Sequence, residues 1–79
     1  MTWEAYVADA ARQLEVAGID NAGANAEYLA SHLLGMTGRG DWRTQRLAAV
    51  GDIQSKQYQE LIQRRLRREP LQYILGEWE

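Results

Sequence analysis

A stripe of apolar residues at helical spacing, ended by a glycine, opens the chain and predicts a helix there. Over residues 3–17 these residues recur with a period near 3.6, as on one face of an α-helix; they are Trp3, Tyr6, Val7, Ala10, Leu14 and Ala17. Thr2 is placed to cap the first turn, Gly18 to end the helix, and Ile19 to pack back on its last turn. No segment shows the two-residue alternation of a half-buried strand, so an all-α fold is predicted.

A second helix is predicted from Ala22 to Leu34. Asn21 is the expected cap of its first turn, and Gly35 supplies its expected end. Several inward positions are small, which lets a neighbouring helix approach closely. The predicted inward positions are Ala22, Ala26, Leu29, Ala30 and Leu33.

Residues 37–51 form the least regular segment. Two glycines disfavour a long helix there, whereas Trp42 and Leu47 are apolar and need burial. We therefore expect a short helix near Asp41–Leu47, with Trp42 as its anchor, and then a turn through Gly51.

A further helix is predicted from Ile53 to Arg68, with Asp52 as its cap. Its predicted core face consists of Tyr58, Leu61, Ile62 and Leu66. Arg65 falls within the same arc, and an unpaired buried guanidinium costs several kcal/mol, so Arg65 needs a partner. Glu69 and Glu27 are the candidates.

Pro70 predicts one more short helix, because proline fits the first helical position and cannot continue the helix before it. Residues 71–75 would form about one and a half turns, closed by Gly76. Together these segments predict a small bundle of four to five helices over residues 1–76. Residues 77–79, Glu-Trp-Glu, alternate as at the beginning of a strand, so we expect the natural protein to continue.

Composition excludes several kinds of function. The 79 residues contain no cysteine and one histidine, so neither a thiolate metal site nor a catalytic set with a histidine and a cysteine or serine is indicated. His32 is predicted to be structural or solvent-facing. No catalytic, cofactor-binding or metal-binding residue is predicted. The chain also lacks an apolar run of roughly 18–20 residues and a signal-like N-terminus, which favours a cytoplasmic protein with no membrane contact.

Four arginines near the C-terminus form the densest charge cluster of a chain whose net charge is −2. Three of them, Arg64, Arg67 and Arg68, are expected to point away from the core and are the candidate partner-binding residues. A solvated helix face is the plain alternative. An acidic protein partner or a nucleic-acid backbone would suit such residues, and the acidic net charge makes nucleic acid the less favoured partner.

The string from Arg64 to Glu79 places Arg-Arg, then Glu-Pro, then Tyr-Ile-Leu-Gly in that order. This string resembles the junction in the HemK/PrmC family of protein-(glutamine-N5) methyltransferases, where it ends a small helical N-terminal domain. Residues 25–35 are similar to a helix of the same family, with Asn25 in place of the usual acid and Ala30 in place of the usual leucine. The resemblance covers nearly the whole chain and is weakest over residues 38–51.

The resemblance implies a parent enzyme that transfers a methyl group from S-adenosylmethionine to a glutamine. That glutamine lies in the Gly-Gly-Gln loop of class 1 peptide chain release factors. The family's catalytic domain binds the cofactor and holds the amide with an Asn-Pro-Pro-Tyr loop. The present chain has one proline and no such loop, so no catalytic or cofactor residue is transferred to it. Residues 1–76 are expected to be the substrate-docking domain, and residues 77–79 the start of the connection to the absent catalytic domain.

Two sets of residues have expected roles in such a protein. The arginine face, or alternatively the acidic first two helices, would meet the release factor. The joint to the protein's own catalytic domain would be fixed by Arg65, Glu69, Pro70, Tyr73 and Gly76. The alternative to a joint role is that these five residues only begin or end helices or pack in the core. The competing function is a stand-alone helical adaptor that binds protein or RNA.

Overall fold

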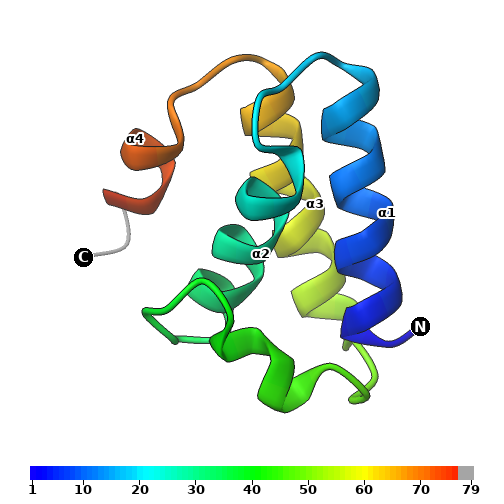
Figure 1. Ribbon diagram of the computed structural model, residues 1–79. Coiled ribbons are helices and arrows are strands. Elements are labelled where there is room, and N and C mark those ends of the chain that lie inside the picture. Colours follow the sequence, from blue (N-terminus) through cyan, green and yellow to red (C-terminus); the bar gives the residue numbers. More distant parts are fainter. Residues whose placement is uncertain (77–79) are drawn as a thin grey trace.

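The computed structural model describes residues 1–76 and shows an all-α bundle, which confirms the predicted fold class (Figure 1). Its elements are α1 (Trp3–Val16), α2 (Ala22–Leu33), the 3-10 helix η1 (Asp41–Gln45), α3 (Asp52–Leu66) and α4 (Leu71–Gly76). Helices α1, α2 and α3 pack together, and α4 lies to one side against α2 and α3. No helix in the described part of the chain has the length and apolar character needed to cross a bilayer. The strand expected at residues 77–79 lies outside the described residues.

Helix α1 forms as its sequence predicts. Thr2 Oγ1 accepts a hydrogen bond from the Ala5 amide at 3.3 Å, which caps the first turn. At the other end Gly18 has a φ of +80°, and the Ile19 amide donates to the Leu14 carbonyl at 2.9 Å. This is the Schellman closure, which satisfies a carbonyl that the helix leaves free. Ile19 is buried, so the predicted fold-back is confirmed.

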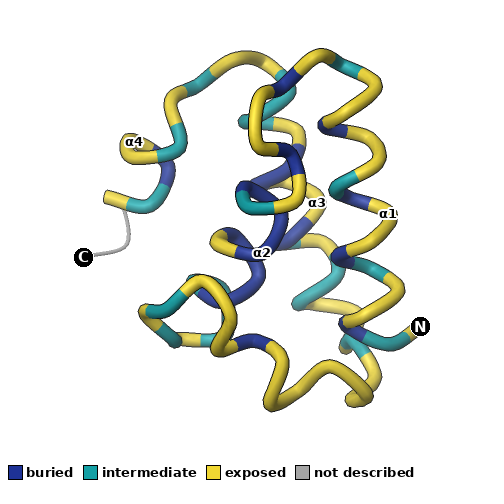
Figure 2. Tube along the Cα trace, viewed as in Figure 1, coloured by how far each residue is buried: buried dark blue, intermediate teal, exposed yellow. Residues whose placement is uncertain are grey.

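Helix α2 is the centre of the bundle, since α1, η1, α3 and α4 all contact it. Burial therefore extends around much of this helix, and its trace is largely dark blue in Figure 2. The buried residues are Ala22, Asn25, Ala26, Glu27, Leu29, Ala30 and Ser31. Leu33, which was predicted to face inward, is half-buried.

The two ends of α2 differ in how well the sequence predicts them. Asn21 occupies the predicted cap position, but it is left-handed, with a φ of 55°, and its side chain does not make the expected capping bond. The side chain of Asn25 instead donates to the carbonyls of Asp20 and Asn21. At the C-terminal end Gly35 has a φ of +76° and closes the helix as expected, one residue before the predicted end.

The third segment is a five-residue 3-10 helix, shorter than the helix predicted there. Trp42 is buried and anchors it, as expected. Its amide donates to Ser31 Oγ at 3.1 Å, and its indole Nε1–H donates to Glu27 at 3.0 Å. The predicted burial of Leu47 is wrong, because this side chain is 68% exposed. Backbone hydrogen bonds to the N-terminal residues hold residues 46–50 in place instead.

Helix α3 begins one residue earlier and ends two residues earlier than predicted. Gly51 takes the cap position, and Asp52 lies in the first turn, where its charge suits the positive helix end. The core face is confirmed for Tyr58, Leu61 and Ile62, which are buried, while Leu66 is half-buried.

The early end of α3 comes from an arginine in the left-handed conformation. Arg68 has a φ of 70°, and the Glu69 amide donates to the Arg64 carbonyl at 3.2 Å, as in the Schellman closure of α1. Glycine is the residue that usually occupies this position, so no residue before Pro70 signals the end of the helix. The left-handed conformation costs a residue with a Cβ about 1–2 kcal/mol.

Candidate functional site

Arg65 joins α3 to α2 and to the residues just before α4. Its Nε donates to Oδ1 of Asn25 at 2.8 Å, and its Nη1 donates to the main-chain carbonyl of Glu69 at 3.1 Å. Of the two predicted partners, Glu69 is reached through its carbonyl rather than its carboxylate, whereas Glu27 binds other groups. A guanidinium on the core side of α3 is therefore satisfied mainly by neutral acceptors.

Glu27 holds η1 against α2. Its carboxylate is nearly buried, accepts the indole hydrogen bond of Trp42, and lies 3.4 and 3.1 Å from the guanidinium groups of Arg39 and Arg43. Three donors on one side chain offset the cost of removing the carboxylate from water. The pairing therefore has a structural role in fixing the η1 segment.

Two of the three arginines of the predicted partner-binding face take part in the fold. Arg64 Nε lies 2.6 Å from the Glu69 carboxylate, and the side chains are only 19% and 35% exposed. Arg68 Nη2 donates to the Ala17 carbonyl at 2.8 Å, at the end of α1. The structure therefore does not present Arg64, Arg67 and Arg68 as one uniform face, and their role in partner binding stays a prediction.

Arg67 lies on the exposed side of α3, the α3 outer face, which also includes Arg64. Within residues 1–76 the Arg67 side chain forms no ion pair or hydrogen bond, and the same holds for Lys56, eleven residues earlier. At 100° per residue this spacing directs both side chains the same way, about 16 Å apart along the axis. They border a shallow hollow of about 550 Å³. The α3 outer face consists of Lys56, Gln59, Glu60, Gln63, Arg64 and Arg67.

Lys56 was missed at the sequence level. A lone lysine on a helix carries no motif, and charge clustering drew attention to the C-terminal arginines. The available signal was its spacing from Arg67, which indicates a shared helix face but does not show that either residue lacks an internal partner.

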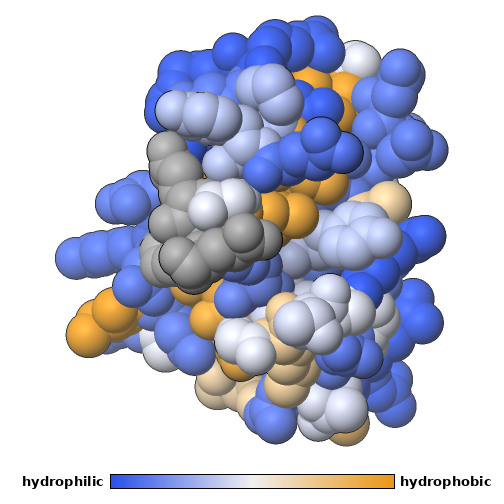
Figure 3. All heavy atoms as spheres, turned by 90° about the vertical axis from the view of Figure 1, so that its left-hand side faces the viewer, coloured by the Kyte–Doolittle hydropathy of each residue, from blue (hydrophilic) through white to orange (hydrophobic). Residues whose placement is uncertain are grey.

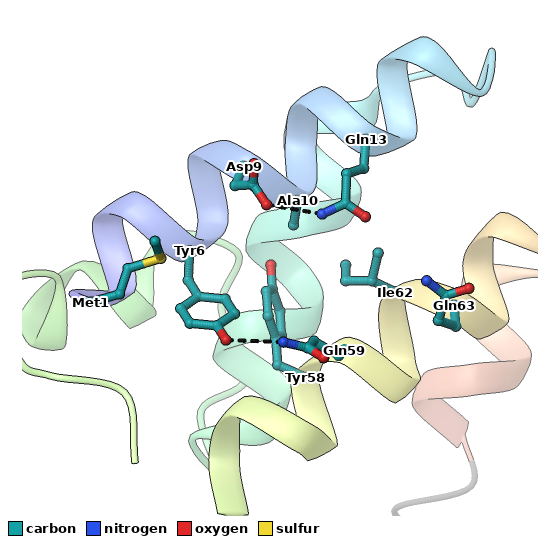
Figure 4. A pocket seen from close by; sticks show the side chains of 9 residues that line it. All are labelled: Met1, Tyr6, Asp9, Ala10, Gln13, Tyr58, Gln59, Ile62 and Gln63. Atoms are coloured by element: carbon teal, nitrogen blue, oxygen red, sulfur yellow. Dashed lines mark hydrogen bonds between the residues drawn. The ribbon is translucent and has the colours of Figure 1, made fainter. Parts of the chain in front are cut away.

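A second hollow, the α1/α3 groove, adjoins this face and has a volume of about 320 Å³ (Figure 4). Its floor is formed by Ala10, Tyr58 and Ile62, and the walls carry carboxamide and carboxylate groups. Tyr6 bonds through its hydroxyl to Gln59 at 3.0 Å and to Ser55. The α1/α3 groove is lined by Met1, Tyr6, Asp9, Ala10, Gln13, Tyr58, Gln59, Ile62 and Gln63.

Tyr58 is a structural tyrosine, although its hydroxyl is strongly perturbed. Burial, and to a smaller extent the charge of Glu27, raises its pKa far above the ordinary value of 10.0. The hydroxyl donates to the Ala26 carbonyl at 2.8 Å, and the ring meets Trp3 edge-on with centroids 5.6 Å apart. The protonated hydroxyl thus ties α3 to α2 at all ordinary pH values and is unsuited to act as a base.

Three of the predicted joint residues, Pro70, Tyr73 and Gly76, lie directly before α4 or within it. The Pro70 carbonyl accepts hydrogen bonds from the amides of Tyr73 and Ile74 at 3.0 and 3.1 Å, which confirms Pro70 as the beginning of a new helical element. Ile74 is fully buried and anchors α4, while Tyr73 is 61% exposed and so is not a core residue. Gly76 is exposed at the end of α4. The assignment of these residues to a domain joint stays a prediction.

A third hollow is lined by residues of α2, of the segment after α2 and of α4. The face that Figure 3 turns toward the viewer carries apolar atoms among hydrophilic ones. The lining of this third hollow includes Leu33, Met36 and Leu75, together with the half-buried His32. Among residues 1–76 no group of three or more metal-binding side chains gathers here or elsewhere.

Comparisons with known proteins identify the family. A model of the PrmC N-terminal domain matches residues 5–76. The release factor glutamine methyltransferase of Mycobacterium leprae (strain TN) is 43% identical over 67 residues, which are 85% of this chain and 22% of that protein. The protein of the same name from Mycobacterium tuberculosis (strain ATCC 25618 / H37Rv) is 40% identical over 76 residues, 96% of this chain and 24% of that protein.

No solved structure matches the chain. The chain spans about a quarter of the length of the curated relatives that it matches. The family match covers α1 from residue 5 onward, and α2, η1, α3 and α4 in full. The chain therefore belongs to the PrmC N-terminal domain family.

Proposed function

We propose that the chain is the N-terminal domain of a release factor glutamine methyltransferase, and that it helps to bind and orient the release factor. The observation that carries this proposal is the family match over residues 5–76, together with relatives named for that activity. The relatives are about four times as long as the chain. Methyl transfer from S-adenosylmethionine is accordingly assigned to the remainder of such a parent protein.

The chemistry of the reaction explains why a separate docking domain is useful. The side-chain amide nitrogen of glutamine is a poor nucleophile, because its lone pair is delocalised into the carbonyl. Methylation therefore depends on holding this nitrogen in line with the methyl group. Contacts far from the reacting atoms supply binding energy that holds the substrate loop in that position.

Such contacts orient the substrate only if the docking domain is itself held firmly. The Arg65 bonds to Asn25 and to the Glu69 carbonyl, with the Arg64–Glu69 ion pair, fix the turn from α3 into α4. In the proposed parent this turn leads toward the catalytic domain. The predicted joint role of Arg65, Glu69 and Pro70 is consistent with this arrangement.

Calorimetric titration of the chain with a class 1 release factor tests the docking role. We expect saturable binding of modest affinity, because a small domain offers a small interface. Serum albumin is the control for non-specific association. Absence of binding to the release factor at the highest soluble concentration would contradict the proposed role.

A further inference from the structure

We propose that the α1/α3 groove and the α3 outer face together bind an extended peptide segment with an apolar side chain flanked by carboxylates. The inference rests on the proposed function, because the segment is assigned to the protein substrate. It names where on the domain the substrate binds and which chemistry is recognised there. The two hollows share Gln59 and Gln63, so one segment can occupy both.

The groove floor fits an apolar anchor. Ala10 is small, and the Tyr58 ring and the Ile62 side chain lie near it (Figure 4). All three residues are buried, so they close the floor of the cavity. A volume of about 320 Å³ accommodates one aliphatic side chain with adjoining backbone. Met1 lies at one end with 74% of its surface exposed, and an unbranched thioether adapts readily to an incoming side chain.

The groove walls fit peptide backbone. Gln13 on α1 and Gln63 on α3 both line the cavity and are both exposed. A carboxamide carries a donor and an acceptor, as does a peptide group, so walls of this kind pair with main chain of any sequence. Gln13 Nε2 already donates to Asp9 at 2.9 Å, which leaves its oxygen to accept a hydrogen bond from the segment.

The charge complementarity comes from Lys56 and Arg67. Within residues 1–76 each of the other seven basic side chains has a polar protein partner. Lys56 and Arg67 have none there, and both lie on the α3 outer face. Carboxylates on both sides of an anchor in the groove would meet these two cations, which are about 16 Å apart along the helix.

The remaining charges favour a peptide over a nucleic acid. Glu60 lies on the α3 outer face between the two cations, and Asp9 stands on the opposite wall of the groove. A nucleic-acid backbone carries a negative charge at every step and would be repelled by both. A peptide can place its carboxylates opposite Lys56 and Arg67 and leave neutral residues opposite the acids.

The direct test uses NMR of the 79-residue chain with a defined probe, the capped peptide Gly-Asp-Asp-Leu-Asp-Asp-Gly. We expect the amide signals of Ala10, Gln13 and Gln63 to shift on binding. A peptide with serine in place of leucine should bind about tenfold more weakly, because the apolar contact is lost. Shifts confined to the hollow between α2 and α4, or equal affinity for the two peptides, would overturn the proposal, as would tighter binding of polyuridylate at the same site.

Charge variants separate the α3 outer face from general electrostatics. Lys56→Gln combined with Arg67→Gln should weaken peptide binding about threefold to tenfold, with the difference shrinking as salt is raised. Glu60→Gln should strengthen it about twofold. The matched control is Arg39→Gln, which also removes a half-exposed cation, and Glu27 retains Arg43 and Trp42 in that variant. Equal losses in the control and in the double variant would overturn the charge assignment.

The same variants in the release factor titration separate this inference from the proposed function. If the release factor binds, and the double variant lowers its affinity as it lowers the affinity for the peptide, both the docking role and the peptide site are supported. If the release factor binds equally well to the double variant and to the unaltered chain, the docking role survives and this site is wrong. If the peptide maps to the groove but the release factor does not bind, the groove remains a peptide site and the proposed function fails.

Discussion

The turn from α3 into α4 and the outer face of α3 contain the same kinds of side chain and use them differently. In the turn, Arg64, Arg65 and Arg68 donate to a carboxylate, a carboxamide and main-chain carbonyls of the same chain. On the outer face, Lys56 and Arg67 have no such partner within residues 1–76. Arg67 and Arg68 are adjacent in sequence and fall on opposite sides of this division.

The difference shows that charge density along a sequence does not identify a binding surface. A guanidinium that donates to its own fold stabilises that fold and is not available to a partner. A cation left without an internal acceptor adds little to stability and can contribute to binding. We therefore expect substitutions of the arginines in the turn to lower the stability of the fold. Substitutions of Lys56 and Arg67 on the α3 outer face should lower the affinity for a binding partner.

The largest effect on stability is expected for Arg65→Ala. The change removes charge-assisted hydrogen bonds to Asn25 and Glu69 and leaves the nearly buried Asn25 amide without its donor. We expect the free energy of unfolding to fall by about 3 kcal/mol. Urea denaturation measures this, with Arg67→Ala as the matched control. Equal losses of stability in the two variants would contradict the distinction between arginines that hold the fold and arginines that do not.

A second large effect is expected for Glu27→Gln, which retains an acceptor for Trp42 but removes the charge that pairs with Arg39 and Arg43. The free energy of unfolding should fall by about 2 kcal/mol, because the carboxylate is nearly buried. Glu4→Gln is the control, since its ion pair with Arg46 is 54% exposed on both sides and contributes little. Equal losses would show that burial does not distinguish the two pairs.

Helix boundaries could be predicted from the sequence where several local signals agreed. In α1 an apolar stripe, a capping threonine and a left-handed glycine all give the same boundaries. Prediction from the sequence failed where a residue adopted a conformation that its type disfavours, as with left-handed Asn21 and Arg68. It also failed for Leu47, because main-chain hydrogen bonds to the N-terminus hold that segment without burying its side chain.

The candidate site was less predictable than the fold for a physical reason. Whether an arginine turns inward depends on acceptors that tertiary packing brings close, such as the Ala17 carbonyl for Arg68. Ala17 and Asn25 lie far away in sequence from the arginines that they accept from, and they carry no local pattern. The α1/α3 groove could not be predicted from the sequence for a similar reason. Its walls include glutamines, which in the sequence look like ordinary exposed helix positions.

The hydrogen bond from the Tyr58 hydroxyl on α3 to the Ala26 carbonyl on α2 should make the stability depend on pH. Because the folded state raises the pKa of Tyr58 above its ordinary value of 10.0, folded and unfolded chains both keep this proton below pH 10.0. Above that pH the unfolded state loses the proton first, so the free energy of unfolding should fall by up to about 1.4 kcal/mol per pH unit. Tyr58→Phe should show a shallower fall in alkaline urea denaturation. An unchanged slope in that variant would assign the pH dependence to other groups.

The smallest effect is expected for Arg68→Gly. Glycine relieves the left-handed strain at this position, and the change loses the hydrogen bond to Ala17, so the two contributions nearly cancel. Thermal denaturation should show a change within about 1 kcal/mol. Gly18→Ala, at the equivalent position of α1, should cost more than 1 kcal/mol, since it introduces strain without any compensating bond. A large loss in Arg68→Gly would mean that the Arg68 side chain holds the two helix ends together.

By the proposed function, these residues bind and orient a protein substrate while the chemistry occurs elsewhere in a longer parent. Methylation kinetics of an intact release factor, by the parent enzyme with and without residues 1–68, test it most directly. We expect the deletion to raise KM, because contacts that bind the release factor are lost, and to lower kcat, because the glutamine is no longer held in line with the methyl group. Unchanged methylation of the intact release factor would contradict this expectation.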